Sequence, residues 1–305
     1  MPKVEEMHNL GPDREGLNWE SDSLAAPDDE AWDLLVIGGG TAGIVAAKTA
    51  ARFGASVLLI ERRRTGGDCL WTGCVPSKSL LSAAHAAADA RRASRLGVHV
   101  EEVRVDFAEV MQHIQSSIAT IEPVDSPASL REVGASVYRG EARFAGSDVA
   151  VVNASKVRFR QAILATGAAP VVPPIPGLST ANMCTNESIF GIDELPSRLL
   201  VLGGGSIGCE LGQAFSRLGS SVTIVEAAQR LLVNEDEDGA EAVTAALVDD
   251  GVDIRTGVSL SEVRQESGRE IATLGDGSTV SFDLILVAVG RRPRTDNLGL
   301  TQAGT

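Results

Sequence analysis

The sequence predicts an α/β protein with two domains, each built of three layers around a parallel sheet and carrying antiparallel strands as well. Three observations lead to this prediction. Short apolar runs, typical of strands buried on both faces of a parallel sheet, lead directly into glycine clusters. A helical pattern follows each cluster, and the complete pattern occurs twice at a constant offset of 165 residues. Short alternating segments elsewhere are typical of antiparallel strands.

The first copy of this pattern begins at Trp32. Leu34–Ile37 is predicted as a buried strand, the residues from the glycines to Phe53 as a helix, and 56–60 as a second strand that ends at an acid. Glycines let the backbone approach a pyrophosphate at the helix N-terminus, and the acid accepts hydrogen bonds from a ribose. These are the features of a Rossmann-like unit. The residues expected to contact such a dinucleotide are Gly38, Gly40, Thr41, Ala42, Gly43 and Glu61.

The second copy occupies 199–226 and repeats the glycines, the acid and several residues between them. A tight glycine turn in an ordinary strand-helix connection would explain one cluster. It would not explain two clusters with their acids at the same distance. We therefore expect a second dinucleotide site. Its expected residues are Gly203, Gly205, Ser206, Ile207, Gly208 and Glu226.

A cysteine pair lies in the segment 66–78, GGDCLWTGCVPSK, where four residues separate Cys69 from Cys74. A disulfide over so short a loop adds little stability, but it suits exchange, in which one thiolate attacks a substrate and the other resolves the mixed disulfide. A helix is predicted to begin at Pro76, which places Cys74 before a helix N-terminus, where the partial positive charge favours a thiolate. Two ordinary buried thiols are the alternative. A zinc site would need a second ligand pair.

The rest of the chain supplies further helices and strands. The predicted elements are helices over 77–96 and 107–121, antiparallel strands over 136–163, a proline-rich linker over 170–176, an acidic helix, and strands near 258–260, 271–274 and 284–289. The acidic run 235–238 is expected to face solvent.

The composition argues against several classes of partner. The chain has 305 residues, a net charge of -14 and a pI near 4.8, so it lacks the basic surface that nucleic acids and anionic membranes attract. No apolar run reaches the length of a membrane span. Residues 1–30 are predicted to be a disordered acidic leader without the apolar core of a signal peptide. We therefore expect a cytoplasmic protein, in which a cysteine pair is more often catalytic than structural.

In their order, these motifs resemble those of the FAD-dependent pyridine nucleotide-disulfide oxidoreductases of the dihydrolipoamide dehydrogenase, glutathione reductase and mercuric reductase type. The shared order is GxGxxG with an acid, GGxCxxxxCxPxK, ATG at 165–167, a second GxGxxG with an acid, and GRxP at 290–293. The resemblance implies an FAD-binding domain at 31–176, an NAD(P)H-binding domain at 177–295, and a return to the first domain at 296–305.

The resemblance also implies roles for individual residues. Cys69 resembles the interchange cysteine that attacks the substrate, and Cys74 resembles the charge-transfer cysteine beside the flavin. Lys78 resembles the lysine near flavin N5, with Glu210 as the carboxylate partner that favours its charged form. No metal ligands are expected. The residues that the resemblance adds to the cofactor sites are Gly67, Asp68, Ala142, Thr166, Gly167, Gly290 and Arg291.

The second site favours NADH over NADPH in this interpretation. The carboxylate of Glu226 suits the free ribose hydroxyls of NADH and repels the 2'-phosphate of NADPH, although Arg230 lies close in sequence and weakens the preference. Ser206 occupies the position at which glutathione reductases share a tyrosine. The dihydrolipoamide dehydrogenase and mercuric reductase types therefore fit better.

The chain departs from the family pattern at several positions. Asp68 replaces the usual threonine before the first cysteine, and Trp71 and Thr72 replace small or amide residues between the cysteines. The family's second FAD motif and its dimerisation domain, with a catalytic His-Glu pair, would lie beyond Thr305. The histidines, none of which matches that catalytic residue, are His8, His85, His99 and His113.

These observations lead to one main functional hypothesis. The chain is expected to pass electrons from NAD(P)H through FAD to a Cys69-Cys74 disulfide, and from there to a small-molecule disulfide or a metal ion. A full-length form is expected to be a homodimer. The alternative is a truncated, inactive remnant that still binds nucleotides. An NADH oxidase or a low-molecular-weight thioredoxin reductase is disfavoured, because those enzymes place their cysteines differently.

Overall fold

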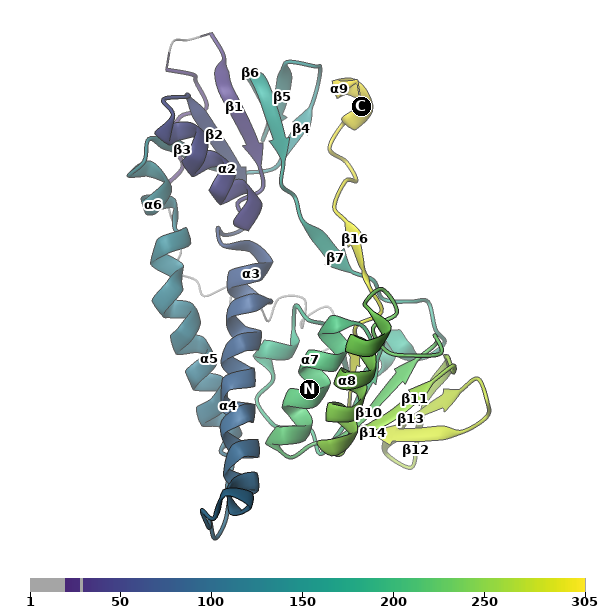
Figure 1. The fold of residues 1–305 in the computed structure, drawn as a ribbon. Helices are drawn as coiled ribbons and strands as arrows, with labels where there is room; N and C mark the ends of the chain where they lie inside the picture. The colour runs from purple at the N-terminus through teal and green to yellow at the C-terminus, as the bar shows by residue number, and fades with distance from the viewer. Residues whose placement is uncertain (1–19, 28–29, 305) are drawn as a thin grey trace. The chain divides into compact units, whose positions relative to one another are not determined.

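The computed structural model describes residues 20–27 and 30–304, which form two compact units (Figure 1). The first-motif unit carries the glycine loop 38–43, and the second-motif unit carries the loop 203–208. The described segments of the first-motif unit are 20–27, 30–71, 118–169 and 292–304, and those of the second-motif unit are 72–117 and 170–291.

The first-motif unit contains a six-stranded mixed sheet. Its strands, in sheet order, are β3 (Ala135–Arg139), β2 (Val57–Glu61), β1 (Trp32–Ile37), β6 (Ser155–Leu164), β5 (Val149–Val152) and β4 (Ala142–Phe144). The pairs from β3 to β6 are parallel, and the hairpin-linked strands β4, β5 and β6 are antiparallel. This combination confirms the predicted parallel sheet with antiparallel strands.

The prediction of antiparallel pairing throughout 136–163 is wrong for β3, which pairs parallel to β2. Helices occupy the long connection between β2 and β3, and they return the chain to the end of the sheet from which β2 started. Only strands joined by short turns must run antiparallel. The alternation of apolar and polar residues did not reveal this difference. In a half-buried edge strand, buried and exposed side chains alternate whether the strand pairs parallel or antiparallel.

Both faces of this sheet are buried. On one face, Val36 and Leu59 pack with Ile44 and Ala47 of helix α2 (Thr41–Arg52). The opposite face packs against the antiparallel strands and the C-terminal residues. The main side chains of that second cluster are Leu35, Ile37, Leu58, Ile60, Phe144, Phe159 and Leu298. Burial on both faces explains why β1 and β2 are almost wholly apolar.

The remaining helices of this unit are short. They are α3 (Gly67–Trp71), the 3-10 turn η2 (Glu122–Asp125), α6 (Pro127–Arg131) and α9 (Leu300–Ala303). Ser126 caps α6 by accepting a hydrogen bond from the Ser129 N-H at 3.2 Å, and a proline follows it at the first helical position.

Part of the segment that the sequence assigns to the leader contacts this unit. Asp22 accepts hydrogen bonds from the Val137 N-H at 2.7 Å and from Arg131 Nε at 3.0 Å, and the Trp32 indole donates to Leu24 O at 3.1 Å. The predicted disorder of residues 1–19 lies outside the described residues.

The second-motif unit contains a five-stranded parallel sheet and an antiparallel meander. The parallel strands, in sheet order, are β11 (Asp253–Thr256), β10 (Ser221–Glu226), β9 (Arg198–Leu202), β15 (Leu284–Val287) and β8 (Met183–Cys184). The meander consists of β12 (Leu260–Glu266), β13 (Arg269–Leu274) and β14 (Thr279–Phe282).

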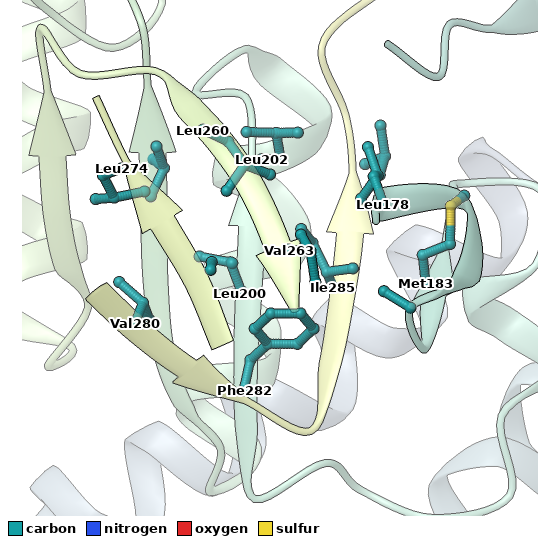
Figure 2. Close-up of a cluster of buried hydrophobic side chains, with 14 residues drawn as sticks. Leu178, Met183, Leu200, Leu202, Leu260, Val263, Leu274, Val280, Phe282 and Ile285 are labelled. Atoms are coloured by element: carbon teal, nitrogen blue, oxygen red, sulfur yellow. The ribbon is translucent and has the colours of Figure 1, made fainter. Parts of the chain in front are cut away.

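The unit has three layers. Leu200 and Ile285 of the parallel sheet pack against Val263 and Phe282 of the meander, in the cluster drawn in Figure 2. Helix α7 (Ser206–Leu218) covers the other face of β9 and β10. The parallel sheet between a helix and a meander is the architecture predicted for this part of the chain.

The other helices of the second-motif unit are α4 (Cys74–Arg92) with the 3-10 turn η1 (Ala93–Leu96), α5 (Phe107–Ile121) up to Ser117, the 3-10 turns η3 (Leu178–Thr180) and η4 (Ile189–Gly191), and α8 (Glu237–Asp249). Helix α4 packs on α7, and the Phe107 and Phe215 rings lie 6.1 Å apart between α5 and α7. Within the described part of the chain, every helix is too short or too polar to cross a membrane.

Two short strands, β7 (Ala168–Pro170) and β16 (Arg291–Pro293), pair with each other where the chain passes between the units. The grouping of 72–117 with the second-motif unit differs from the continuous domain at 31–176 that the sequence suggested. The domain boundaries stay a prediction.

Candidate functional site

The two glycine loops have the same backbone geometry. Gly38 and Gly203 both adopt a φ of +109°, which glycine tolerates and other residues rarely adopt. The Gly38 N-H donates to Ile60 O at 2.9 Å, and the Gly203 N-H donates to Val225 O at 2.8 Å. The sequence duplication is therefore also a duplication of conformation.

The third glycine of each motif allows the helix to approach the strand. A Cβ at Gly43 would lie 1.8 Å from Gly38 O, and a Cβ at Gly208 would lie 2.0 Å from Gly203 O. Neither distance is possible without moving the backbone. These two glycines shape the loops by close packing, and their role does not require contact with a ligand.

The second glycine of each motif begins a helix that no side chain caps. Gly40 precedes α2 and Gly205 precedes α7, neither helix has an acid in its first turn, and Thr41, Ala42 and Ser206 are exposed there. A Cβ at Gly205 would meet no atom within 4 Å. The uncapped N-H groups at the start of both helices fit the pyrophosphate of a dinucleotide.

Each acid is held against its own glycine loop. Glu61 accepts from the Gly39 N-H at 2.7 Å and from the Arg63 N-H at 2.7 Å. Glu226 accepts from the Gly204 N-H at 2.7 Å and from the Ala228 N-H at 2.8 Å. A carboxylate has about four lone-pair positions, so each acid keeps acceptor capacity for ribose hydroxyls. The residues at both motifs therefore fit the groups that the sequence assigns to them.

Four of the remaining residues expected near a cofactor, Thr166, Gly167, Gly290 and Arg291, lie close to the segments where the chain passes from one unit to the other. Thr166 Oγ1 donates to Arg294 O at 2.7 Å, and Gly167 O accepts from the Arg294 N-H at 2.9 Å. In the second-motif unit, Gly290 O accepts from the Val171 N-H at 2.9 Å, directly before Arg291 begins β16. The last of the set, Ala142, is buried in β4.

Helix α4 begins at Cys74, two residues before the predicted start at Pro76. A proline fits the third helical position because the first N-H groups of a helix have no intrahelical acceptor. Cys74 is exposed in the first turn of this helix. Cys69 is partly buried in α3 of the first-motif unit.

Lys78 forms an ion pair with Glu210, which α7 presents to α4. The Ser77 hydroxyl donates to the same carboxylate at 3.1 Å. The Lys78 side chain is 67% exposed. The helix that carries Cys74 is thus bonded to the helix that carries the second glycine loop.

The other two cysteines are buried in the second-motif unit. Burial raises the pKa of the Cys184 thiol, and burial together with the Glu226 carboxylate raises the pKa of Cys209 to about 11. Cys209 donates to Gly204 O at 3.4 Å. Both thiols are therefore protonated at neutral pH and unsuited to exchange.

Two groups of contacts were missed from the sequence. Arg64 lies over the Trp71 ring, and a buried cluster forms around Asp250. The unusual Trp71 between the cysteines was a signal for the first group. The structure also explains why an acid is tolerated at position 68. The Asp68 carboxylate lies in the first turn of α3, where a helix favours negative charge.

Within the described residues, no three His, Cys, Asp or Glu side chains are grouped as metal ligands would be.

A family model described as "Pyridine nucleotide-disulphide oxidoreductase" matches residues 32–305. The chain is 34% identical over 286 residues to a mercuric reductase of Lysinibacillus sphaericus, covering 93% of this chain and 52% of that protein. It is 35% identical over 280 residues to a dihydrolipoyl dehydrogenase of Geobacillus stearothermophilus, covering 89% and 59%.

A solved structure also matches. The Cu(II) complex of the HOCl-induced flavoprotein disulfide reductase RclA from Escherichia coli has a TM-score of 0.76 and 30% sequence identity, covering 89% of this chain and 59% of that chain. The chain thus spans about half the length of the curated relatives it matches.

Proposed function

Because the chain belongs to the pyridine nucleotide-disulphide oxidoreductase family, we propose that it reduces an acceptor through the Cys69-Cys74 pair, using NAD(P)H and FAD. The observation that carries the proposal is the position of Cys74. Its exposed thiol lies in the first turn of α4, the helix that also presents Lys78 to Glu210. A thiolate next to a helix N-terminus suits disulfide exchange.

The first glycine loop and Glu61 would hold FAD, and the second loop and Glu226 would hold the nicotinamide nucleotide. When bound, FAD supplies a flavin that accepts a hydride and passes two electrons to a disulfide. The chain's residues orient the two dinucleotides by their pyrophosphates and riboses. Lys78 would add positive charge near Cys74, and Glu210 would hold the direction of its ammonium group.

The chemistry of the cysteine pair follows from exchange. Reduction of the disulfide takes up two electrons and two protons and gives two thiols. The Cys69 thiolate then attacks a disulfide acceptor and displaces one of its sulfurs as a thiol. The Cys74 thiolate attacks Cys69 of the mixed disulfide, which releases the second thiol and restores the pair.

NADH is the preferred nucleotide in this proposal. Glu226 is bonded to the second glycine loop and would repel a 2'-phosphate. Arg230, which sequence position alone left as a possible phosphate ligand, donates to the carbonyls of Leu232 at 2.6 Å and Glu235 at 2.9 Å. Because these bonds occupy its guanidinium, Arg230 offers less to an added phosphate.

The acceptor is a disulfide or a metal ion. The relatives named mercuric reductase and dihydrolipoyl dehydrogenase support these two classes. A homodimer of a longer form and a cytoplasmic location belong to the same proposal.

The visible spectrum of the purified chain tests this function. With added FAD, the protein is expected to turn yellow and to gain long-wavelength absorbance when NADH is added, whereas Cys74→Ser is expected to lose that absorbance. NADPH in place of NADH tests the nucleotide preference. A protein that is colourless after incubation with FAD and removal of the unbound FAD would contradict the proposal and support an inactive remnant. Assays with Hg(II) and with lipoamide then separate the acceptors.

A further inference from the structure

The turn between β2 and α3 is closed by the side chain of Trp71. The Trp71 indole Nε1 donates to Thr65 O at 2.8 Å. The guanidinium carbon of Arg64 lies 3.7 Å from the centroid of the Trp71 ring, within the range of a cation-π contact. Trp71 is therefore attached to two consecutive residues of the turn.

The same turn leaves no room for a side chain at either of its two glycines, Gly66 and Gly67. Gly66 has a φ of +103°, and a Cβ there would lie 2.4 Å from Leu70 Cδ2 and 3.0 Å from Trp71 Nε1. Gly67 has a φ of +59°, and a Cβ there would lie 2.5 Å from Gly40 Cα. The turn thus packs against Trp71 on one side and against the first glycine loop on the other.

Helix geometry relates this attachment to Cys69. Consecutive helical residues are about 100° apart, so Cys69 and Trp71 point in roughly opposite directions from α3. The contacts of Trp71 therefore hold the face of α3 that lies opposite the Cys69 thiol. A helix of five residues has little stability of its own, so its orientation depends on such contacts.

We propose that Trp71 and Arg64 are positioning residues for the Cys69 thiol, which they fix relative to the first glycine loop. The inference rests on the proposed function, because it concerns the same cysteine pair. When the contacts of Trp71 are removed, α3 samples other orientations. The Cys69 thiol then becomes more accessible to small reagents, and its disulfide with Cys74 forms less favourably.

Two readouts test the proposal without any cofactor. The first is the equilibrium constant of the Cys69-Cys74 disulfide in glutathione buffers, and the second is the rate at which iodoacetamide alkylates Cys69 in the reduced protein, resolved by mass spectrometry. Trp71→Leu removes both contacts and is expected to lower the equilibrium constant about tenfold. Trp71→Phe and Arg64→Met each remove one contact and are expected to have smaller effects in the same direction.

Trp32→Phe is the matched control. The Trp32 indole also donates to a backbone carbonyl, Leu24 O at 3.1 Å, and the side chain is buried in β1 of the same unit. This variant is expected to lower the melting temperature while leaving both Cys69 readouts near the wild-type values. If Trp71→Leu lowers the melting temperature in the same way and changes neither readout, Trp71 is only structural and the proposal is overturned.

Failure of the proposed function gives a different result. In that case the wild-type protein forms no Cys69-Cys74 disulfide at any glutathione ratio. The alkylation rate of Cys69 still tests the role of Trp71, because it requires neither a disulfide nor a nucleotide. A faster rate in Trp71→Leu than in both wild type and Trp32→Phe supports the positioning role even then.

Discussion

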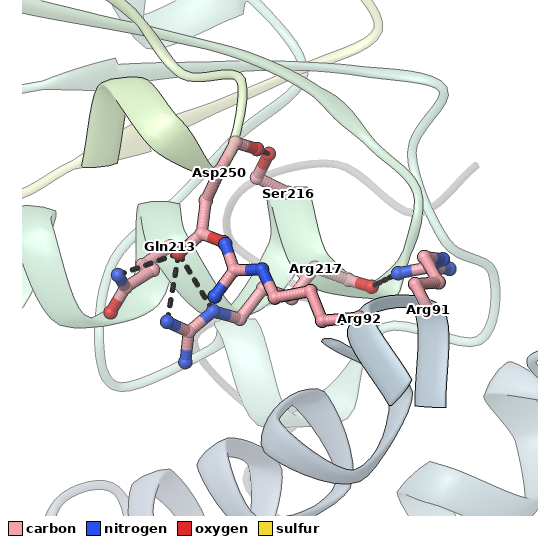
Figure 3. Close-up of polar contacts among 6 residues, drawn as sticks. All are labelled: Arg91, Arg92, Gln213, Ser216, Arg217 and Asp250. Atoms are coloured by element: carbon pink, nitrogen blue, oxygen red, sulfur yellow. Dashed lines mark hydrogen bonds and ion pairs between the residues drawn. The ribbon is translucent and has the colours of Figure 1, made fainter. Parts of the chain in front are cut away.

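Arg92, in the last turn of α4, donates to the carboxylate of Asp250, which directly follows α8. The Asp250 side chain is 4% exposed, and its carboxylate also accepts from Gln213 Nε2 and Arg217 Nε, each at 2.8 Å (Figure 3). Arg91 donates to Arg217 O beside this cluster. The far end of the helix that begins at Cys74 is therefore joined to α7 and α8 through one buried carboxylate.

Removal of this carboxylate is expected to destabilise the protein strongly. Asp250→Ala leaves the guanidinium of Arg217, which is only 10% exposed, without its counter-charge. Loss of one partner of a buried ion pair reduces the free energy of unfolding by about 3–5 kcal/mol. Urea denaturation of the variant measures the change. The matched control is Asp148→Ala, which breaks an exposed ion pair with Arg158 and is expected to change stability by less than about 1 kcal/mol. Equal effects of the two variants would contradict the role of Asp250.

An alanine at Gly208 is expected to disrupt the second glycine loop. Its Cβ would lie 2.0 Å from Gly203 O, so α7 must move away from β9. We expect a loss of stability of more than about 1 kcal/mol together with loss of NADH binding. Melting temperature and nucleotide titration by fluorescence measure the two effects.

Gly239 provides the control for this substitution. It lies in α8 with no atom within 4 Å of its Cβ position, so Gly239→Ala is expected to stabilise the protein by about 0.5–1 kcal/mol through helix propensity. NADH binding should stay unchanged in Gly239→Ala. Normal NADH binding by Gly208→Ala would show that the close approach of helix and strand is not needed.

Glu210→Gln is expected to separate stability from function. The Lys78 side chain is 67% exposed, and an ion pair of that kind contributes only about 0–1 kcal/mol. The melting temperature should therefore change little. Because Lys78 loses the carboxylate that orients it, the NADH-dependent change in visible absorbance should become slower in stopped-flow measurements. A large stability loss with an unchanged rate would assign Glu210 to the fold alone.

The stability of the protein is expected to fall in acid through two aspartates. Hydrogen bonds from the Ser56 N-H and hydroxyl hold the pKa of Asp33 below its usual value, and the Arg198 guanidinium does the same for the pKa of Asp283. A carboxyl group whose pKa is lower in the folded state stabilises the protein above the unfolded pKa of 3.8. This contribution is lost as the pH falls through the folded values.

Urea midpoints measured between pH 6 and pH 2 are the test of this dependence. Asp33→Asn and Asp283→Asn should each be less stable than wild type at pH 6, and each difference should shrink below the unfolded pKa near 3.8. A difference that stays constant over this range would mean that the carboxylate charge is not the cause.

The sequence by itself determined the two glycine loops, their acids, the strands before them and the family. These features depend on residues close together in the chain: a positive φ that needs glycine, an apolar run that needs burial on two faces, and an acid that reaches the loop beside it. The confirmed parallel sheets follow from this pattern. A helix that follows a strand carries the chain back to the other end of the sheet, so the next strand runs parallel to the first.

Tertiary structure decided the contacts between residues far apart in the chain. The parallel pairing of β3, the ion pair of Lys78 with Glu210 and the cluster around Asp250 all join segments that no local pattern relates. Even the contact of Trp71 with Arg64, which is near it in sequence, forms in a turn that packs against Gly40. Local conformational preference and burial can be read from neighbouring residues, whereas the partner of a buried charge depends on how the complete chain packs.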